Sequence, residues 1–314
     1  MARAPLLAVV ALLAGVVLQS AGAAAKGEER VLVVLATSGP KPYTVGEVER
    51  TAQEVDAFYQ TSSLGRLRLH VDVTPWLAAF QVSPGCGGLT NDSFEAVLAP
   101  ARVAADQAGF NAAQYDDAMY AIADAHCAFH GETWGHEVML TTQPTLQLLT
   151  HELGHTFGLG HAQSTDCGAL HPVRCAHEGT GDPFSPMGHG TLDFSAYEKV
   201  LLGWLPRQPH VTSAGTYALA VPTIKTATRQ ALVVDDTEGS WWIEYRARPF
   251  RGLVIRFVEA DDVRSPFAPP SVVILDPGKT GRPWLARGQS YRIPGSFRVT
   301  LIRAGASTAD VRLR

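Results

Sequence analysis

The stretch HELGHTFGLGH, residues 151–161, decides how the middle of this chain folds and what it can bind. On a helix, His151 and His155 are one turn apart and share a face, so their imidazoles can hold one zinc ion together. Gly158 ends that helix, because glycine adopts the left-handed backbone conformation without steric cost. The turn brings His161 back as a third ligand. Three protein ligands leave a fourth position for water, which is the arrangement of catalytic zinc sites.

The same stretch carries the residue expected to act on that water. Zinc held by three neutral imidazoles polarises a carbonyl group and lowers the pKa of its water. Glu152 follows the first ligand, and we expect it to accept a proton from the water and deliver it to the leaving group. Every position that the chemistry needs is intact, which argues against an inactive site.

The pattern HExxHxxGxxH resembles the signature of the metzincin zinc endopeptidases. In that family a methionine in a tight turn packs beneath the metal site. Of the 4 Met of the chain, Met187 alone follows the motif, in the turn-forming sequence GDPFSPMGHG. The resemblance therefore implies that Met187 is the methionine of this Met-turn. It also implies that residues near 129–142 include an edge strand that aligns the substrate, as in β-augmentation.

The longer stretch 181–205, GDPFSPMGHGTLDFSAYEKVLLGWL, is similar to the gametolysin-like branch of the metzincins. The resemblance is good over residues 145–206 and more diffuse over 31–144 and 210–250. It implies a secreted zinc endopeptidase that acts on extracellular or cell-wall proteins. Many metzincins place a tyrosine two residues after the Met-turn methionine, but this chain has His189 there. His189 and Tyr197 are the candidates for a further transition-state donor, and His189 can equally be an exposed turn residue.

Residues 1–25 predict a signal peptide, with Arg3 before an apolar run and small residues at the cleavage site. The apolar run is too short for a comfortable membrane span. We therefore expect an extracellular protein without a membrane anchor. The formal net charge of −4 gives no reason to expect nucleic acid or an anionic membrane as a partner.

Four cysteines in a secreted chain predict two disulfides, for which three pairings exist. No CxxC pair occurs, so a cysteine-based metal site is disfavoured. Proximity in the sequence favours Cys86–Cys127 and Cys167–Cys175.

The order of predicted elements indicates an α+β protein of two domains. Residues 26–208 are expected to form a metzincin-like peptidase domain, with a mixed twisted sheet and the zinc-binding helix over 145–157. From residue 209 to 314 the sequence shows short β-type runs between Gly, Pro and Asp, which is typical of a β-sandwich. Paired Trp241 and Trp242 in that module suggest either a carbohydrate site or, more commonly, one core-facing and one partly exposed side chain. The histidines outside the motif, His189 apart, are assigned to the surface or to loops.

Two other functions are compatible with the motif. One is a secreted binding or adhesion protein built on an inactive peptidase fold, and the other is a zinc hydrolase of a non-protein amide or ester. Asp-containing loops leave a structural calcium site open, although no loop matches the EF-hand pattern. The natural protein or peptide substrate, the control of latency and the oligomeric state do not follow from the sequence.

Overall fold

The computed structural model describes residues 25–86, 90–123, 125–168, 170–260, 271–277 and 281–314. Residues 1–24, and with them nearly all of the predicted signal peptide, lie outside the described residues. The described part of the chain is a mixture of helices and three sheets, so the α+β class is confirmed. None of its helices combines the length and the apolar character needed to cross a bilayer.

The first sheet has the strand order β2-β1-β3-β5-β4. Strands β2, β1, β3 and β5 run parallel, and the edge strand β4 pairs antiparallel with β5. The sequence predicted one short strand in the β4–β5 region, but the structure has two, joined by a turn at Gly135. The strands are β1 (Gly27–Thr37), β2 (Leu67–Ala78), β3 (Asp117–Ile122), β4 (Gly131–Trp134) and β5 (Glu137–Leu140).

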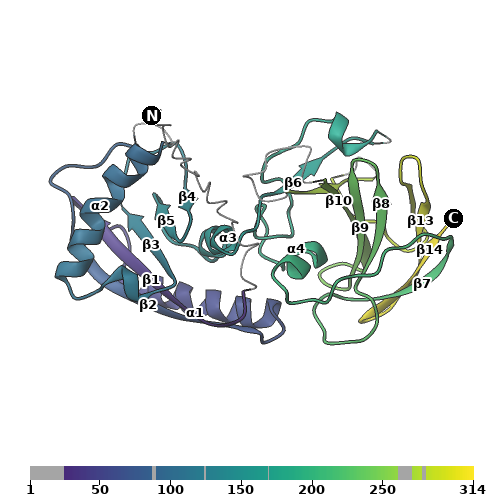
Figure 1. The fold of residues 1–314 in the computed structure, drawn as a ribbon, viewed down its shortest axis with the longest axis horizontal. Helices are drawn as coiled ribbons and strands as arrows, with labels where there is room; N and C mark the ends of the chain where they lie inside the picture. The colour runs from purple at the N-terminus through teal and green to yellow at the C-terminus, as the bar shows by residue number, and fades with distance from the viewer. Residues whose placement is uncertain (1–24, 87–89, 124, 169, 261–270, 278–280) are drawn as a thin grey trace, which may run out of the picture.

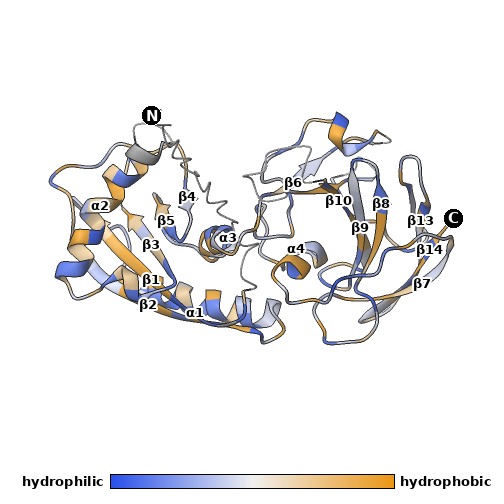
Figure 2. Ribbon diagram, in the orientation of Figure 1, coloured by the Kyte–Doolittle hydropathy of each residue, from blue (hydrophilic) through white to orange (hydrophobic). Residues whose placement is uncertain are grey.

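Residues 31–36 of strand β1 are a continuous apolar run because both faces of the sheet are covered there. Val31, Val33 and Leu35 face the helices α1 (Val45–Ser62) and α3 (Leu146–Thr156). The alternate residues Leu32 and Val34 face α2 (Asn91–Gln107) and are as fully buried. Figure 2 shows β1 and β3 as the hydrophobic centre of this sheet. Each buried Val or Leu side chain contributes roughly 1.5–3 kcal/mol to folding.

Helix α3 carries the histidine motif, and its two ends are defined by its own sequence. The Thr145 side chain accepts a hydrogen bond from the Leu148 amide and caps the first turn. At the other end Gly158 has a φ of 86°. The Leu159 amide then donates to the Gly154 carbonyl and the Gly158 amide to the His155 carbonyl, which is the Schellman arrangement. The helix therefore stops where the motif predicted.

Two further sheets follow α3, and side chains from both meet in one core. One has the order β6-β11-β10-β9-β8 and the other β12-β13-β14-β7. Strand β6 (Ala162–Thr165) begins directly after His161 and pairs in parallel with β11. A strand from before residue 208 therefore belongs to a sheet whose other members come after it, and α3 lies between the first sheet and this one (Figure 1).

The remaining strands are β7 (Gly215–Ala220), β8 (Ala231–Asp236), β9 (Gly239–Arg246), β10 (Gly252–Glu259), β11 (Val272–Leu275), β12 (Ser290–Arg292), β13 (Arg298–Ala304) and β14 (Thr308–Leu313). The sequence predicted the first seven and missed β14. Two short 3-10 helices, η1 (Ala112–Gln114) and η2 (Pro172–Arg174), and the helix α4 (Ala196–Leu201) complete the elements of the described residues. Trp241 is fully buried, whereas Trp242 is half-buried against Tyr197, as alternation along a strand predicts.

Both predicted disulfides are present, Cys86–Cys127 and Cys167–Cys175. The first joins the segment after β2 to the segment after β3. The second closes the loop that contains η2. This loop lies between the third histidine of the motif and the turn around Met187, residues 181–190, which we call the Met187 turn. The cysteine pairing inferred from proximity in the sequence is confirmed.

We expect the two disulfides to contribute unequally to stability. In the chain-entropy model, the bridge with a sequence separation of 41 contributes about 4 kcal/mol and the bridge with a separation of 8 about 2.5 kcal/mol. Paired Cys→Ala variants of each bridge should show this order in denaturant-induced unfolding. An equal or larger loss for the Cys167/Cys175 variant would contradict the entropic assignment.

Candidate metal centre

Three imidazoles converge at the C-terminal half of α3. The ring centroids of His151, His155 and His161 lie 4.7, 5.2 and 4.9 Å from one another. One ring nitrogen from each lies within 4.8 Å of the other two. The Nε2 atoms of His151 and His155 are 3.1 Å apart. The helix sets the first two rings one turn apart, and the Schellman turn places the third, so this group can hold a metal ion.

Backbone carbonyl groups orient two of the three rings. Nδ1 of His151 lies 2.8 Å from the Pro186 carbonyl oxygen, and Nδ1 of His155 lies 2.8 Å from the Leu159 carbonyl oxygen. A carbonyl only accepts, so each Nδ1 carries the hydrogen and each Nε2 presents a lone pair. Two lone pairs that face each other at this distance repel, and a cation between them removes the repulsion.

Burial keeps the three imidazoles neutral. Burial, and after it the neighbouring His151, lower the pKa of His155 to about 4. Burial also lowers the pKa of His151 and of His161. A neutral imidazole is the form that binds metal, so the rings are ready to bind near neutral pH without losing a proton.

Glu152 is buried beside the three rings and is held by strand β4. The Thr133 hydroxyl donates to Glu152 Oε2 over 2.6 Å. Burial raises the pKa of Glu152 to about 7, while the bond from Thr133 lowers it and the nearby Glu132 raises it. No sequence pattern pointed to Thr133, because it reaches Glu152 across the gap between a sheet edge and a helix.

An open cleft of about 840 Å³ contains this group. One side of it is formed by Phe129–Thr133, which includes most of the edge strand β4. The other side includes Thr180, Gly188 and His189 from the segment around the Met187 turn. His151, Glu152, His155 and His161 all line the cleft, so a bound substrate would reach all four.

Met187 packs directly beneath α3, at the position that the Met-turn resemblance implies. Its side chain is fully buried, and a Cβ at Gly154 would overlap its sulfur atom. The Met187 carbonyl also accepts from the Ala162 amide over 2.8 Å. Gly154 is the x before the second His of the motif, and the structure shows why this site needs glycine there: it lets the turn approach the helix.

His189 lies at the rim of the cleft and is exposed. Its Nδ1 lies 2.9 Å from the Thr180 carbonyl oxygen, so Nδ1 carries the hydrogen. In the neutral ring Nε2 then has no hydrogen to donate to an oxyanion. The structure thus brings His189 to the cleft, and it limits the donor role to the protonated ring.

Tyr197, the second candidate donor, lies elsewhere. It is buried on α4, and its ring packs against Trp242 with centroids 5.2 Å apart. It is not among the residues that line the cleft. The structure therefore does not bring Tyr197 to the three histidines, because α4 turns this side chain toward the core that it shares with β9.

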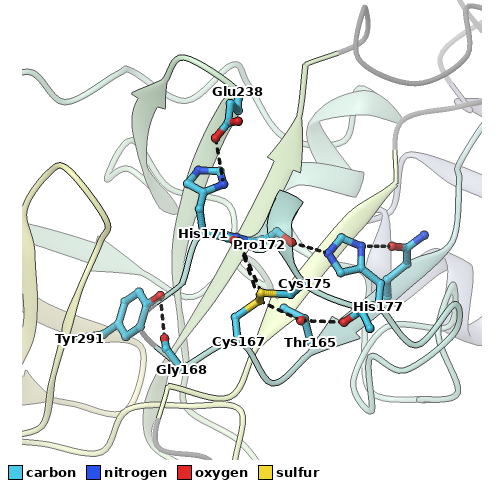
Figure 3. The surroundings of a disulfide bond; sticks show 11 residues. Thr165, Cys167, Gly168, His171, Pro172, Cys175, His177, Glu238 and Tyr291 are labelled. Carbon is cyan, nitrogen blue, oxygen red and sulfur yellow. Dashed lines mark hydrogen bonds and ion pairs between the residues drawn. A yellow bond between two sulfur atoms is a disulfide. The ribbon is translucent and has the colours of Figure 1, made fainter.

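A second group of potential metal ligands contains His171, Asp236 and Glu238. His171 lies in the disulfide loop, but its side chain is buried (Figure 3). Its Nε2 is 3.3 Å from an Asp236 oxygen and its Nδ1 is 3.3 Å from a Glu238 oxygen. Because each nitrogen faces a different carboxylate, this geometry suits an imidazole that bridges two carboxylates better than one that shares a metal with them. The contact joins the disulfide loop to the β8–β9 turn.

No protein-family model matches this chain, and no curated protein matches it. A functional assignment therefore depends on the histidine group, Glu152 and the cleft that contains them. The two carbonyl acceptors Pro186 and Leu159 complete the site, and a sequence pattern cannot reveal them because any residue supplies a backbone carbonyl.

We expect Gly154→Ala to destabilise the protein although alanine favours helices. The new methyl group would overlap Met187, which costs about 1–3 kcal/mol and outweighs the helix gain of about 1 kcal/mol. Met187→Ala should cost about 2–5 kcal/mol alone. The double variant should lose less than the two single losses added together, because the smaller side chain makes room for the methyl group.

Denaturant unfolding of the metal-free protein measures these four free energies. Gly46→Ala in α1 is the matched control, since a Cβ there meets nothing within 4 Å, and it should be neutral or slightly stabilising. Additive losses at positions 154 and 187 would show that the helix and the turn are not in contact.

The bond from Thr133 predicts a shift in pH dependence. The Thr133 hydroxyl lowers the pKa of Glu152, so Thr133→Val should raise it. If Glu152 must be ionised to accept a proton, the acid limb of kcat/KM against pH moves to higher pH in this variant. Thr133→Ser keeps the hydroxyl and should keep the wild-type limb. An acid limb that stays in place in Thr133→Val would exclude this coupling.

Proposed function

We propose that this protein is a secreted zinc metalloendopeptidase of the metzincin type, similar to the gametolysin-like branch. It would hydrolyse peptide bonds of extracellular or cell-wall proteins. The observation that carries the proposal is the convergence of His151, His155 and His161 around one point, with Glu152 beside them in an open cleft. Two disulfides are compatible with an oxidising, extracellular environment.

The donor set suits zinc. Tetrahedral zinc lies about 2.0–2.1 Å from each imidazole nitrogen, which separates the nitrogens by roughly 3.3 Å. The observed Nε2–Nε2 separation of His151 and His155 is 3.1 Å. Both rings donate the hydrogen on their other nitrogen, Nδ1, to a backbone carbonyl, as zinc-binding histidines usually do. When bound, zinc would polarise the scissile carbonyl and lower the pKa of a water molecule in the cleft.

Glu152 is the general base and acid of the proposed mechanism. In the metal-free protein burial raises its pKa to about 7, which suits a group that must accept a proton and release it again near neutral pH. It takes a proton from the attacking water and transfers it to the amine that leaves. Thr133 holds the carboxylate by its Oε2, so the second oxygen, Oε1, is left to exchange the proton.

The cleft suits an extended polypeptide. Strand β4 pairs on one side with β5, and it forms the end of the sheet in the described structure. An edge strand exposes backbone donors and acceptors with which an added chain can pair. Because Thr133 of β4 contacts Glu152, a peptide bound along this edge would pass the three histidines. This supports a peptide substrate over a small amide or ester.

Membership of the metzincins is supported by contacts that a helix with three histidines does not require. Gly158 turns the chain toward His161, and Met187 packs under Gly154 at the base of the site. Pro186, next to Met187, accepts from the first histidine. These features link the motif and the turn in the way that the resemblance implies.

Two variants test the assignment by separating metal binding from catalysis. Glu152→Gln should keep zinc and lose turnover by about 10²–10⁴-fold, because an amide does not accept the proton. His155→Ala should lose both zinc and turnover. Zinc content of the purified protein and cleavage of casein or gelatin, each with and without a chelator, give the two measurements.

Each alternative function has its own result in this experiment. A binding protein on an inactive fold would keep zinc and cleave neither protein in its wild-type form. A hydrolase of non-protein amides would also leave both proteins intact but would turn over an acylated amine in a chelator-sensitive way. Full zinc occupancy in His155→Ala would overturn the ligand assignment itself.

A further inference from the structure

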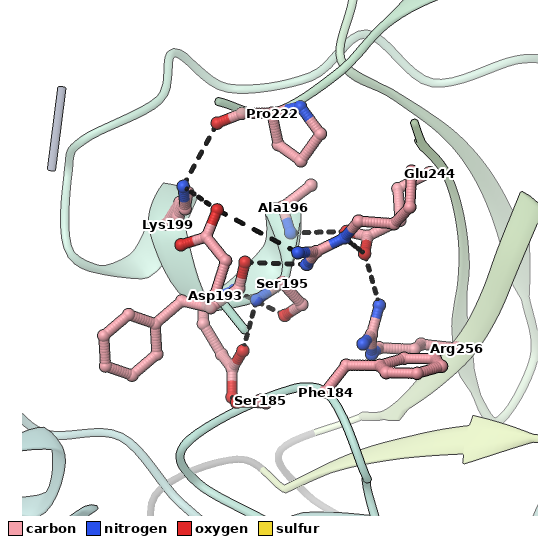
Figure 4. Close-up of polar contacts among 12 residues, drawn as sticks. Phe184, Ser185, Asp193, Ser195, Ala196, Lys199, Pro222, Glu244 and Arg256 are labelled. Carbon is pink, nitrogen blue, oxygen red and sulfur yellow. Dashed lines mark hydrogen bonds and ion pairs between the residues drawn. The ribbon is translucent and has the colours of Figure 1, made fainter. Parts of the chain in front are cut away.

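Buried charges join the sheet β6-β11-β10-β9-β8 to the Met187 turn. Figure 4 shows one of their contacts, between Arg256 and Glu244. Arg256, in β10, is 1% exposed. Its Nε donates to Asp182 Oδ2 over 2.9 Å and its Nη1 to Glu244 Oε1 over 2.6 Å. A buried charge is costly unless it is paired, so Arg256 fixes the position of Asp182 relative to the sheet.

The other oxygen of Asp182 accepts hydrogen bonds from the first backbone amides of the turn that carries Met187. Asp182 Oδ1 accepts from the Phe184 amide over 2.8 Å and from the Ser185 amide over 3.2 Å. The Ser185 hydroxyl accepts from the Met187 amide over 3.1 Å and donates to Glu198. One carboxylate therefore holds Arg256 on one side and the start of the turn on the other.

The Met187 turn orients the first histidine of the motif. Pro186, between Ser185 and Met187, presents its carbonyl oxygen to His151 Nδ1. The Gln147 side chain, one turn earlier on α3, donates to the Gly188 carbonyl over 3.1 Å. A continuous series of hydrogen bonds thus runs from Arg256 through Asp182 and the turn backbone to the His151 ring.

The same sheet also contacts the third histidine. The Val272 amide, at the start of β11, donates to the His161 carbonyl over 3.2 Å. Residues 162–165 then continue as β6 beside β11. Two of the three histidines are therefore held, directly or through the turn, by residues that come more than 90 positions later in the chain.

The surrounding charges keep Arg256 paired. Burial raises the pKa of Glu244, but Arg246 and Arg256 lower it more, and the result is about 2. Glu198 is buried as well, and burial raises its pKa. Lys199 is fully buried and bonds Asp193 over 2.6 Å. Glu244 thus faces Arg256 as an anion near neutral pH. Replacing the guanidinium by an apolar side chain would leave both Glu244 and Asp182 without this partner.

We propose that Arg256 is a positioning residue for the metal centre: from strand β10 of the neighbouring sheet it sets the Met187 turn, and through Pro186 the His151 ring. The proposal rests on the zinc site proposed above. It assigns to the C-terminal sheet a part in metal binding that the motif itself does not indicate.

Full-length protein with Arg256→Met and with Arg256→Lys tests this. Arg256→Met removes the charge and the hydrogen bonds to Asp182 and Glu244. Arg256→Lys keeps the charge but lacks the planar guanidinium that contacts both carboxylates. Zinc affinity, measured by competition with a chromophoric chelator, should fall about 10–100-fold in Arg256→Met and less in Arg256→Lys. In the metal-free protein, the His151 Nδ1–H signal in NMR should shift or exchange faster in both.

Leu301→Ala is the control for general destabilisation, because Leu301 is fully buried in β13, in the apolar core of the two later sheets, and is not a member of the series of hydrogen bonds described above. It should lower the melting temperature and leave zinc affinity and the His151 signal unchanged. If Arg256→Met does not fold, Arg256→Lys carries the test.

Folded Arg256 variants with wild-type zinc affinity and an unmoved His151 signal would overturn the proposal and leave the zinc site standing. Wild-type protein without zinc binding would instead overturn the proposed function. A shifted His151 signal with weaker zinc binding, absent in Leu301→Ala, supports the positioning role.

Discussion

The contact between helix α3 and the Met187 turn is the constraint on which the rest of the site depends. The helix supplies His151 and His155, and the turn supplies the carbonyl that orients His151 and the methionine that fills the space beneath Gly154. A side chain at Gly154 would separate the two segments. The close approach then determines where His161 can lie, because the chain must leave the helix at Gly158 and return along β6.

Because of this constraint, segments from before and after residue 208 belong to one sheet. Strand β6 follows His161 and pairs with β11, which comes from a region predicted as a separate domain. A parallel pair at this point gives the third histidine a rigid support, since β6 is held by backbone hydrogen bonds on the side of β11. The buried pair of Arg256 and Asp182 provides a second tie between the same sheet and the turn. The candidate metal centre therefore lies between the sheets rather than on one of them.

The electrostatics of the two regions differ in kind. Around the histidines, burial keeps the imidazoles neutral and raises the pKa of Glu152. Around Arg256, burial is offset by ion pairs with Asp182 and Glu244. The first environment suits groups that must bind a cation and exchange protons. The second holds a backbone turn in one position. If the turn moved away, a buried charge would lose its partner, which is strongly destabilising.

The sequence by itself determined the local parts of this protein. Helical spacing placed His151 and His155 on one face, glycine at position 158 ended the helix, and short β-type runs located seven of the strands after residue 209. These features depend on neighbours a few residues apart, which a sequence displays directly. The disulfides followed from pairing cysteines that are adjacent in the sequence order, at separations of 41 and 8.

Only the tertiary structure decided which distant groups meet. Three hydrogen bonds join residues that lie 19, 35 and 74 positions apart: Thr133 with Glu152, Pro186 with His151, and Arg256 with Asp182. Tyr197 faces the core rather than the cleft for the same reason, since the packing of α4 on β9 sets its direction. Such contacts arise from how sheets and helices pack, and no periodicity along the chain records them. A backbone carbonyl or a buried arginine looks ordinary in the sequence and gains its role from what it touches.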